Sequence, residues 1–198
     1  MRSIRYIFLV LALMLTAASC NPFATSTIVG IIKTENGGTD WQFRNTVEGE
    51  NAGNLNDLRF SSIRFAPDNS EVLYAGSYDG GLFQSATSGN SWKRILSRIG
   101  VYDIAINTFN PAELFVGGFF ADHGKVLTSK DGGKSWVEIY NEESTGNAVR
   151  AIALNPTNPQ NMIIGLSSGA VNASTDSGIT WKSLLTFNDK INQIVWTT

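Results

Sequence analysis

The sequence contains few of the residue types that build disulfide frameworks, zinc sites and basic surfaces. It has one Cys and one His among 198 residues, which excludes an internal disulfide and a Cys-rich or multi-His metal centre. Charged residues make up only 16% of the chain and the net charge is −2, unlike the basic surface of a nucleic-acid-binding protein. The sequence therefore predicts no metal, no cofactor and no nucleic-acid partner.

Apolar residues and glycine are plentiful. Hydrophobic residues account for 42% of the chain, and there are 19 Gly and 5 Trp. A chain of this length and composition can bury one good core and is too apolar for a disordered protein. The low charge and the high glycine content favour an all-β fold.

The N-terminus has the pattern of an export signal. Arg2 and Arg5 form a short basic segment, and an almost wholly apolar run follows over residues 7–18. This run is too short to span a bilayer comfortably as a helix and fits the apolar region of a secretory signal. The sequence thus predicts a signal peptide over residues 1–19 and an exported protein.

The position of the one cysteine makes this signal more specific. Small residues directly precede Cys20, an arrangement that resembles bacterial lipoprotein signals, although Ala17 stands where that family usually has Leu. The resemblance implies that Cys20 is lipidated, that residues 20–27 form a tether, and that the protein is membrane-anchored outside the cytoplasm. An ordinary signal peptide that contains a Cys is the alternative.

The rest of the chain is internally repetitive. Four Trp residues each close a similar octapeptide, and the octapeptides are TENGGTDW (34–41), SATSGNSW (85–92), SKDGGKSW (129–136) and STDSGITW (174–181). A second block recurs upstream in phase, as IRFAPDNSEVLYAG (63–76), IAINTFNPAELFVG (104–117) and IALNPTNPQNMIIG (152–165). Two motifs that recur together at this period indicate a repeat architecture.

Each unit is expected to fold as four short strands. The first alternates polar and apolar residues, an Asn/Pro turn follows, and the second is a continuous apolar run typical of a strand buried on both faces. The octapeptide forms the turn before the fourth strand. Four strands in about 45 residues is the size of a β-propeller blade, so the sequence predicts an all-β propeller over 28–198. The expected units are 28–45, 58–95, 101–140, 148–186 and a partial unit 191–198.

The octapeptide resembles the Asp-box, or bacterial neuraminidase repeat, which occurs in sialidase-like, sortilin-like and photosystem II assembly-factor-like propellers. The resemblance is strong in the last two copies, whereas Asn36 and Thr87 replace the aspartate in the first two. It implies a structural box in the hairpin between the third and fourth strands. The box residues are then Trp41, Ser85, Gly89, Trp92, Ser129, Asp131, Gly133, Trp136, Ser174, Asp176, Gly178 and Trp181.

The number of blades is about three and a half to four, which leaves two interpretations. The segment 191–197 could join 28–45 in a composite blade that closes a four-bladed ring. Alternatively, the chain is the N-terminal part of a larger propeller. In the second case both end blades expose apolar faces, which favours dimerisation or aggregation.

One connection between a second and a third strand stands out as a candidate ligand site. It contains Phe119, Phe120, Asp122 and His123, and it is three residues longer than its counterpart around Tyr78 and Asp79. An aromatic platform with polar groups suits a ligand contact. The alternative is that both Phe side chains pack onto the neighbouring blade and that His123 is solvated.

The most favoured function is a non-catalytic binding or assembly scaffold with a protein or carbohydrate ligand. The resemblance also includes glycoside hydrolases, which need two carboxylates across the scissile bond. Asp79 and Asp122, on comparable connections of adjacent blades, are the candidate pair. However, no Arg-Ile-Pro signature of sialidases precedes the first box, and fold alone does not confer chemistry. A purely structural surface protein is a third possibility.

Overall fold

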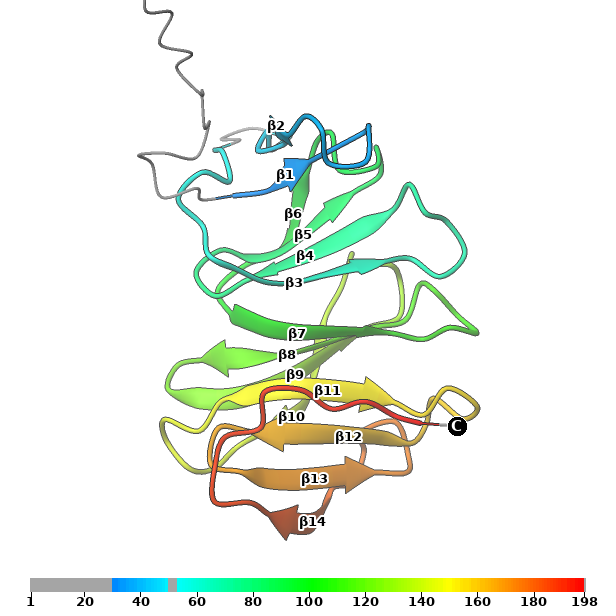
Figure 1. The fold of residues 1–198 in the computed structure, drawn as a ribbon. Coiled ribbons are helices and arrows are strands. Elements are labelled where there is room, and N and C mark those ends of the chain that lie inside the picture. Colours follow the sequence, from blue (N-terminus) through cyan, green and yellow to red (C-terminus); the bar gives the residue numbers. More distant parts are fainter. Residues whose placement is uncertain (1–29, 50–52, 198) are drawn as a thin grey trace, which may run out of the picture.

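The computed structural model describes residues 30–49 and 53–197, and every regular element in them is a β-strand. The predicted signal peptide (residues 1–19), Cys20 and the whole predicted tether (residues 20–27) therefore lie outside the described residues. Three antiparallel sheets of four strands and one of two strands are stacked along the chain (Figure 1). This arrangement confirms the predicted all-β fold with propeller-like blades.

The four sheets are named blades 1 to 4 in chain order. Blade 1 consists of β1 (Ile32–Lys33) and β2 (Gln42–Phe43). Blade 2 consists of β3 (Phe60–Phe65), β4 (Leu73–Ser77), β5 (Gly81–Ser85) and β6 (Lys93–Leu96). Blade 3 consists of β7 (Gly100–Ile106), β8 (Leu114–Phe120), β9 (His123–Ser129) and β10 (Val137–Asn141). Blade 4 consists of β11 (Val149–Leu154), β12 (Met162–Leu166), β13 (Ala170–Ser174) and β14 (Lys182–Thr186).

In each complete blade the strands are hydrogen-bonded in sequence order, so every connection is a hairpin. The apolar second strands are the best buried, as expected: all five residues of β4 and the first five of β8 are buried. The core lies between blades, with separate apolar clusters at the interfaces of blades 1 and 2, 2 and 3, and 3 and 4. Blade stacking is therefore the main source of apolar burial.

A glycine on each second strand sets the distance between blades. A Cβ built on Gly76 would lie 2.6 Å from a methyl of Val101, and one on Gly117 would lie 2.8 Å from a methyl of Val149. Both Val residues belong to the innermost strand of the next blade. Because no side chain larger than hydrogen fits there, the glycine that ends each recurring 14-residue block is a packing requirement.

The four Asp-box turns share one hydrogen-bond pattern. The hydroxyl at the first position accepts a bond from the N–H of the glycine four residues on, at 2.8–2.9 Å. The side-chain oxygen at the third position accepts one from the N–H four residues further on, at 2.9–3.0 Å. Asn36 and Thr87 make this second bond just as Asp131 and Asp176 do, so the two degenerate copies keep the turn.

The Trp that closes each of the last three boxes packs onto the preceding blade. The indole N–H of Trp92 donates to the carbonyl of Arg44 at 2.9 Å, that of Trp136 to Ile95 at 3.2 Å and that of Trp181 to Ile139 at 2.9 Å. Each acceptor lies on or directly after the fourth strand of the preceding unit. The boxes therefore join blades as well as closing hairpins.

The segment after β14 differs from the expected strand. Residues 187–197 contain no β-strand, because the second strand with which a first strand would pair is not present among the described residues. Ile191 and Ile194 instead lie over Gly165, in the place that Val149 takes over Gly117. Blade 1 and this segment lie at different ends of the stack, so residues 30–45 and 187–197 form no composite blade (Figure 1).

No helix among residues 30–49 and 53–197 is long and apolar enough to cross a membrane.

Candidate functional site

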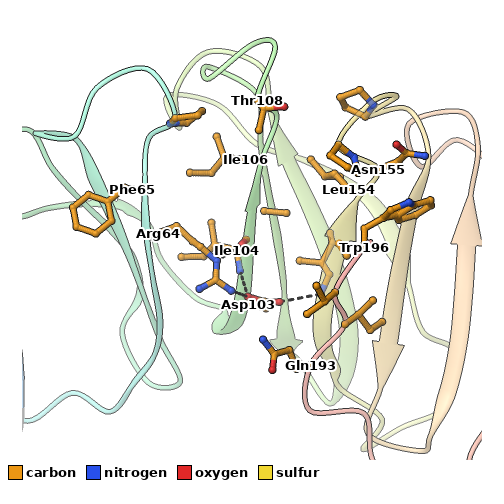
Figure 2. Close-up of a pocket in the computed structure, with 18 residues that line it drawn as sticks. Arg64, Phe65, Asp103, Ile104, Ile106, Thr108, Leu154, Asn155, Gln193 and Trp196 are labelled. Carbon is orange, nitrogen blue, oxygen red and sulfur yellow. Dashed lines mark hydrogen bonds and ion pairs between the residues drawn. The ribbon is translucent and has the colours of Figure 1, made fainter. Parts of the chain in front are cut away.

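The innermost strands β3, β7 and β11, together with residues 193–196, line a cavity of about 430 Å³. We call it the axial cavity. Figure 2 shows Arg64 and Phe65 on one side, Asp103 in the middle, and Leu154 and Trp196 on the other side. It thus spans the inner edges of three blades and the segment that follows them.

Equivalent positions of successive units supply the apolar lining. Phe65, Ile106, Leu154 and Trp196 each follow the recurring Ile of their unit by two residues, and all four line the cavity. Pro67, Pro156 and Pro159 extend this lining at the turns. Phe65 is 61% exposed, so at least one large apolar side chain is accessible there. This lining suits an apolar or aromatic group.

Asp103 is the acidic residue of the cavity, and it joins three blades. Its carboxylate accepts bonds from the guanidinium of Arg64 at 2.7 Å, from its neighbour's N–H at 2.9 Å and from the N–H of Ile152 at 3.1 Å. The side chain is only 13% exposed. Burial raises the pKa of Asp103, against the opposing effect of these hydrogen bonds and of the Arg64 charge. The carboxylate thus joins blades 2, 3 and 4 through hydrogen bonds, and the guanidinium of Arg64 balances its charge.

Sequence reasoning missed Asp103 and Arg64. The signal that could have found Asp103 is its position, because Ser62 and Ala151 occupy the equivalent places in the neighbouring units. A buried carboxylate at a position where the other units have small, uncharged residues needs a hydrogen-bonding or charged partner to offset the cost of its burial.

The predicted connection between β8 and β9 is a longer hairpin rather than a loose loop. Phe120 pairs with His123 across a two-residue turn, in which Ala121 and Asp122 have φ of 49° and 64°. The ring Nδ1 of His123 lies 2.7 Å from the carbonyl oxygen of Glu142, and the imidazole is half-buried. Phe120 is 42% exposed.

Phe119 faces a different surface from the axial cavity. It lines a small cavity of about 230 Å³ with Tyr102, Arg150 and Ser167, between blades 3 and 4. Tyr102 and Arg150 lie where the ladder between the first and second strands is irregular, and such bulges redirect side chains.

Tyr78 and Asp79 belong to a stack of arginine and tyrosine side chains that crosses blades. Asp79 receives two bonds from Arg59, at 2.7 and 2.9 Å. The guanidinium carbon of Arg59 lies 5.9 Å from the centre of the Tyr78 ring, and the centres of the Tyr78 and Tyr102 rings are 4.8 Å apart. Arg150 then covers Tyr102 at 5.3 Å. The sequence analysis identified only Tyr78 and Asp79 of this group.

The structure gives Asp79 a guanidinium partner, and the hydrogen bond from Arg59 lowers the pKa of Asp79. A carboxyl with a lowered pKa is a poor general acid at neutral pH. No hydrogen bond joins Asp79 to Asp122 in the parts of the chain that are described. The sequence analysis predicts no catalytic residue, and this pair belongs only to its glycosidase alternative.

Among residues 30–49 and 53–197, no three His, Cys, Asp or Glu side chains gather in a way that could hold a metal ion.

Known proteins resemble this chain in structure only. No protein-family model and no curated protein sequence matches it. An ancestral GH74 enzyme is 23% identical with a TM-score of 0.62, over 79% of this chain and 21% of that one. The GH74 xyloglucanase from Xanthomonas campestris is 16% identical with a TM-score of 0.61, over 79% and 27%. YCF48 bound to the D1 peptide is 21% identical with a TM-score of 0.51, over 64% and 40%.

At these identities the likeness establishes the fold, an Asp-box β-propeller, and no more. The chain spans between 21% and 40% of the length of these three structures, so its blades correspond to part of each.

Proposed function

We propose that this protein is an exported, lipid-anchored propeller that binds a protein ligand without chemically changing it, and that the axial cavity is the binding site. The observation that carries the proposal is the accessible apolar lining of this cavity around a neutralised Arg64–Asp103 pair. We favour a peptide with an exposed apolar side chain over a carbohydrate, because prolines and aliphatic groups dominate the lining.

The chemistry of the lining favours binding over hydrolysis. A glycosidase needs two carboxylates, whereas Asp103 is the one carboxylate among the residues that line the axial cavity. That carboxylate already accepts three hydrogen bonds, which leaves it little capacity to exchange a proton with a substrate. YCF48, which resembles this chain in fold, is known in a structure bound to the D1 peptide, and this is a further reason to begin with peptides.

Phe65→Ala tests the site. Phe65 is largely exposed, so its removal is expected to leave the fold intact. Peptides selected from a random phage-displayed library on the purified protein are expected to bind Phe65→Ala about ten- to a hundredfold more weakly, since a buried Phe contributes roughly 1.5–3 kcal/mol. Fluorescence anisotropy with labelled selected peptides measures the affinity.

Phe109→Ala is the matched control. Phe109 is 70% exposed in the turn after β7 and does not line the axial cavity. It is expected to leave the affinity unchanged. Equal weakening by both variants, or no selected peptide that distinguishes Phe65→Ala from the native chain, would refute the axial site. Enrichment on a glycan array in place of peptides would transfer the proposal to a carbohydrate ligand.

Glycoside hydrolysis is the second candidate, because the two GH74 structures above share the fold over 79% of this chain. Xyloglucan is the substrate to test. Release of reducing sugar that disappears in Asp79→Asn or Asp122→Asn would replace the scaffold proposal with an enzymatic one.

The lipid anchor has its own test. If Cys20 is lipidated, the native chain produced in a bacterial host enters the detergent-rich phase of a phase separation, and Cys20→Ser moves to the aqueous phase. Mass spectrometry of the mature N-terminus should show the added acyl mass. A native chain that remains in the aqueous phase would favour the ordinary signal peptide.

A further inference from the structure

The two ends of the blade stack carry complementary halves of one interface. Within the chain, each box Trp donates to the carbonyl three residues after the preceding box Trp, as Trp92 does to Arg44 and Trp136 does to Ile95. Trp181 continues the series with Ile139. The next acceptor in this series is Leu184 on β14, and the described part of the chain places no Trp against it.

At the other end, no described blade lies beyond Trp41. Among the described residues its indole N–H donates to the carbonyl of Gly38 in its own box alone, at 3.0 Å. Trp136 and Trp181 make this same local bond in addition to their bond across the blade interface. Trp41 is 47% exposed, whereas Trp92 is 1% exposed.

The glycine at the fifth box position makes a contact across the interface in two of the three internal boxes. A Cβ built on Gly133 would lie 2.5 Å from Ile95, and one on Gly178 would lie 2.5 Å from Ile139. In both boxes the glycine thus fits over the residue whose carbonyl the box Trp binds. Among the described residues Gly38 has only its own Trp41 within 4 Å, and Gly89 likewise has only Trp92, so this contact supports the interface without by itself marking an open end.

The apolar surfaces around these two halves are exposed. Trp41 and Phe43 are 47% and 57% exposed on blade 1. On blade 4, Leu184, Leu185 and Phe187 are 50%, 47% and 55% exposed. Ile95 and Ile139, the equivalents of Leu184 in blades 2 and 3, are instead half-buried under the next box. Figure 1 places β2 and β14 at opposite ends of the stack.

We propose that a second copy of this chain completes this interface, with blade 1 of one copy stacked on blade 4 of the other. Trp41 and Gly38 of one copy then fit over Leu184 of its partner, as Trp136 and Gly133 fit over Ile95 within the chain. The contact continues the geometry of the three internal blade interfaces. It does not depend on the ligand proposed above.

The contact joins unlike surfaces, so pairing is head to tail. Heterologous contacts form closed rings when the rotation between copies closes, and open filaments when it does not. Two copies supply six four-stranded and two two-stranded sheets, which is within the range of blade numbers in known propellers. A closed dimer with its twofold axis along the propeller axis is therefore the expected assembly.

Sedimentation velocity of the purified chain over a range of concentrations tests the proposal. The native chain should sediment as a dimer, and Trp41→Ala or Leu184→Asp should convert it to a monomer. Phe109→Asp is the control, since Phe109 is even more exposed than Trp41 and Leu184 but lies in the turn between β7 and β8. Circular dichroism checks that each variant is folded.

Mixing the two variants distinguishes this interface from any other. Trp41→Ala keeps an intact Leu184 face and Leu184→Asp keeps an intact Trp41 face, so an equimolar mixture should form a heterodimer through one contact, which neither variant forms alone. A native chain that stays monomeric at every concentration, or a dimer that survives both substitutions, would overturn the proposal.

Discussion

At the scale of single residues, each Asp-box turn contains hydrogen-bond acceptors at two positions. An amide in Asn36, a hydroxyl in Thr87 and a carboxylate in Asp131 all accept the same backbone N–H. These side chains bond to backbone four residues away, a local interaction that a sequence motif specifies directly. The carboxylate adds charge to the turn, and with it a dependence on pH.

The two box carboxylates predict acid sensitivity. Hydrogen bonds from Thr180 and Ser174 lower the pKa of Asp176 to about 2, and those from Ser135 and Ser129 also lower the pKa of Asp131. A group whose pKa is lower in the folded state stabilises the fold above its unfolded pKa of about 4, and this stabilisation is lost as the pH falls through the folded value. The contribution of these two carboxylates to the free energy of unfolding should therefore stay constant above about pH 4 and decrease as the pH falls towards 2.

Urea denaturation at several pH values measures this dependence. The double variant Asp131→Asn, Asp176→Asn should have a flatter acid limb, because an amide in this position keeps the turn, as Asn36 does, but does not titrate. If native and variant lose stability equally between pH 4 and pH 2, the box carboxylates are not responsible.

At the scale of elements, the separation of blades is set where a second strand meets the next innermost strand. Gly117 on β8 lies under Val149 on β11, and a Cβ there would come within 2.8 Å of a methyl group. Gly117→Ala should lower the free energy of unfolding by roughly 1–3 kcal/mol, the usual effect of overpacking a core. Chemical denaturation measures the change.

Two variants test the cause. Gly53→Ala should be nearly neutral, since no atom of the described residues lies within 4 Å of its added methyl group. Val149→Ala should restore part of the stability lost in Gly117→Ala when the two are combined, because it removes the clashing methyl group. Additive losses in the double variant would show that the contact is not the reason for the glycine.

At the scale of the whole molecule, stability should vary along the stack. Blade 3 has a neighbouring blade on each side, and most of β8 is buried, whereas all residues of β2 and β14 are exposed. Stacked repeats take much of their stability from neighbour interfaces. Native-state hydrogen exchange should therefore be slowest in β8 and fastest in β2 and β14 of the monomer. Uniform protection across all blades would contradict this prediction.

The sequence by itself determined the unit of the fold. The box, the Asn/Pro turn and the apolar second strand act over short stretches, so their spacing predicted the hairpins and the propeller class. It also singled out Tyr78, Asp79 and the hairpin of Phe119 to His123, but not the surfaces on which they lie.

Only the tertiary structure revealed the axial cavity, the Arg64–Asp103–Ile152 link and the unmatched Trp41 and Leu184. The partners of Asp103 are 39 and 49 residues away in the sequence, and its burial depends on how three blades stack. Local patterns do not show which inner strands converge, because the contacts that stack the blades join residues 41 to 48 positions apart in the sequence. The position of each unit in the stack, not its sequence, decides which of its surfaces remains open.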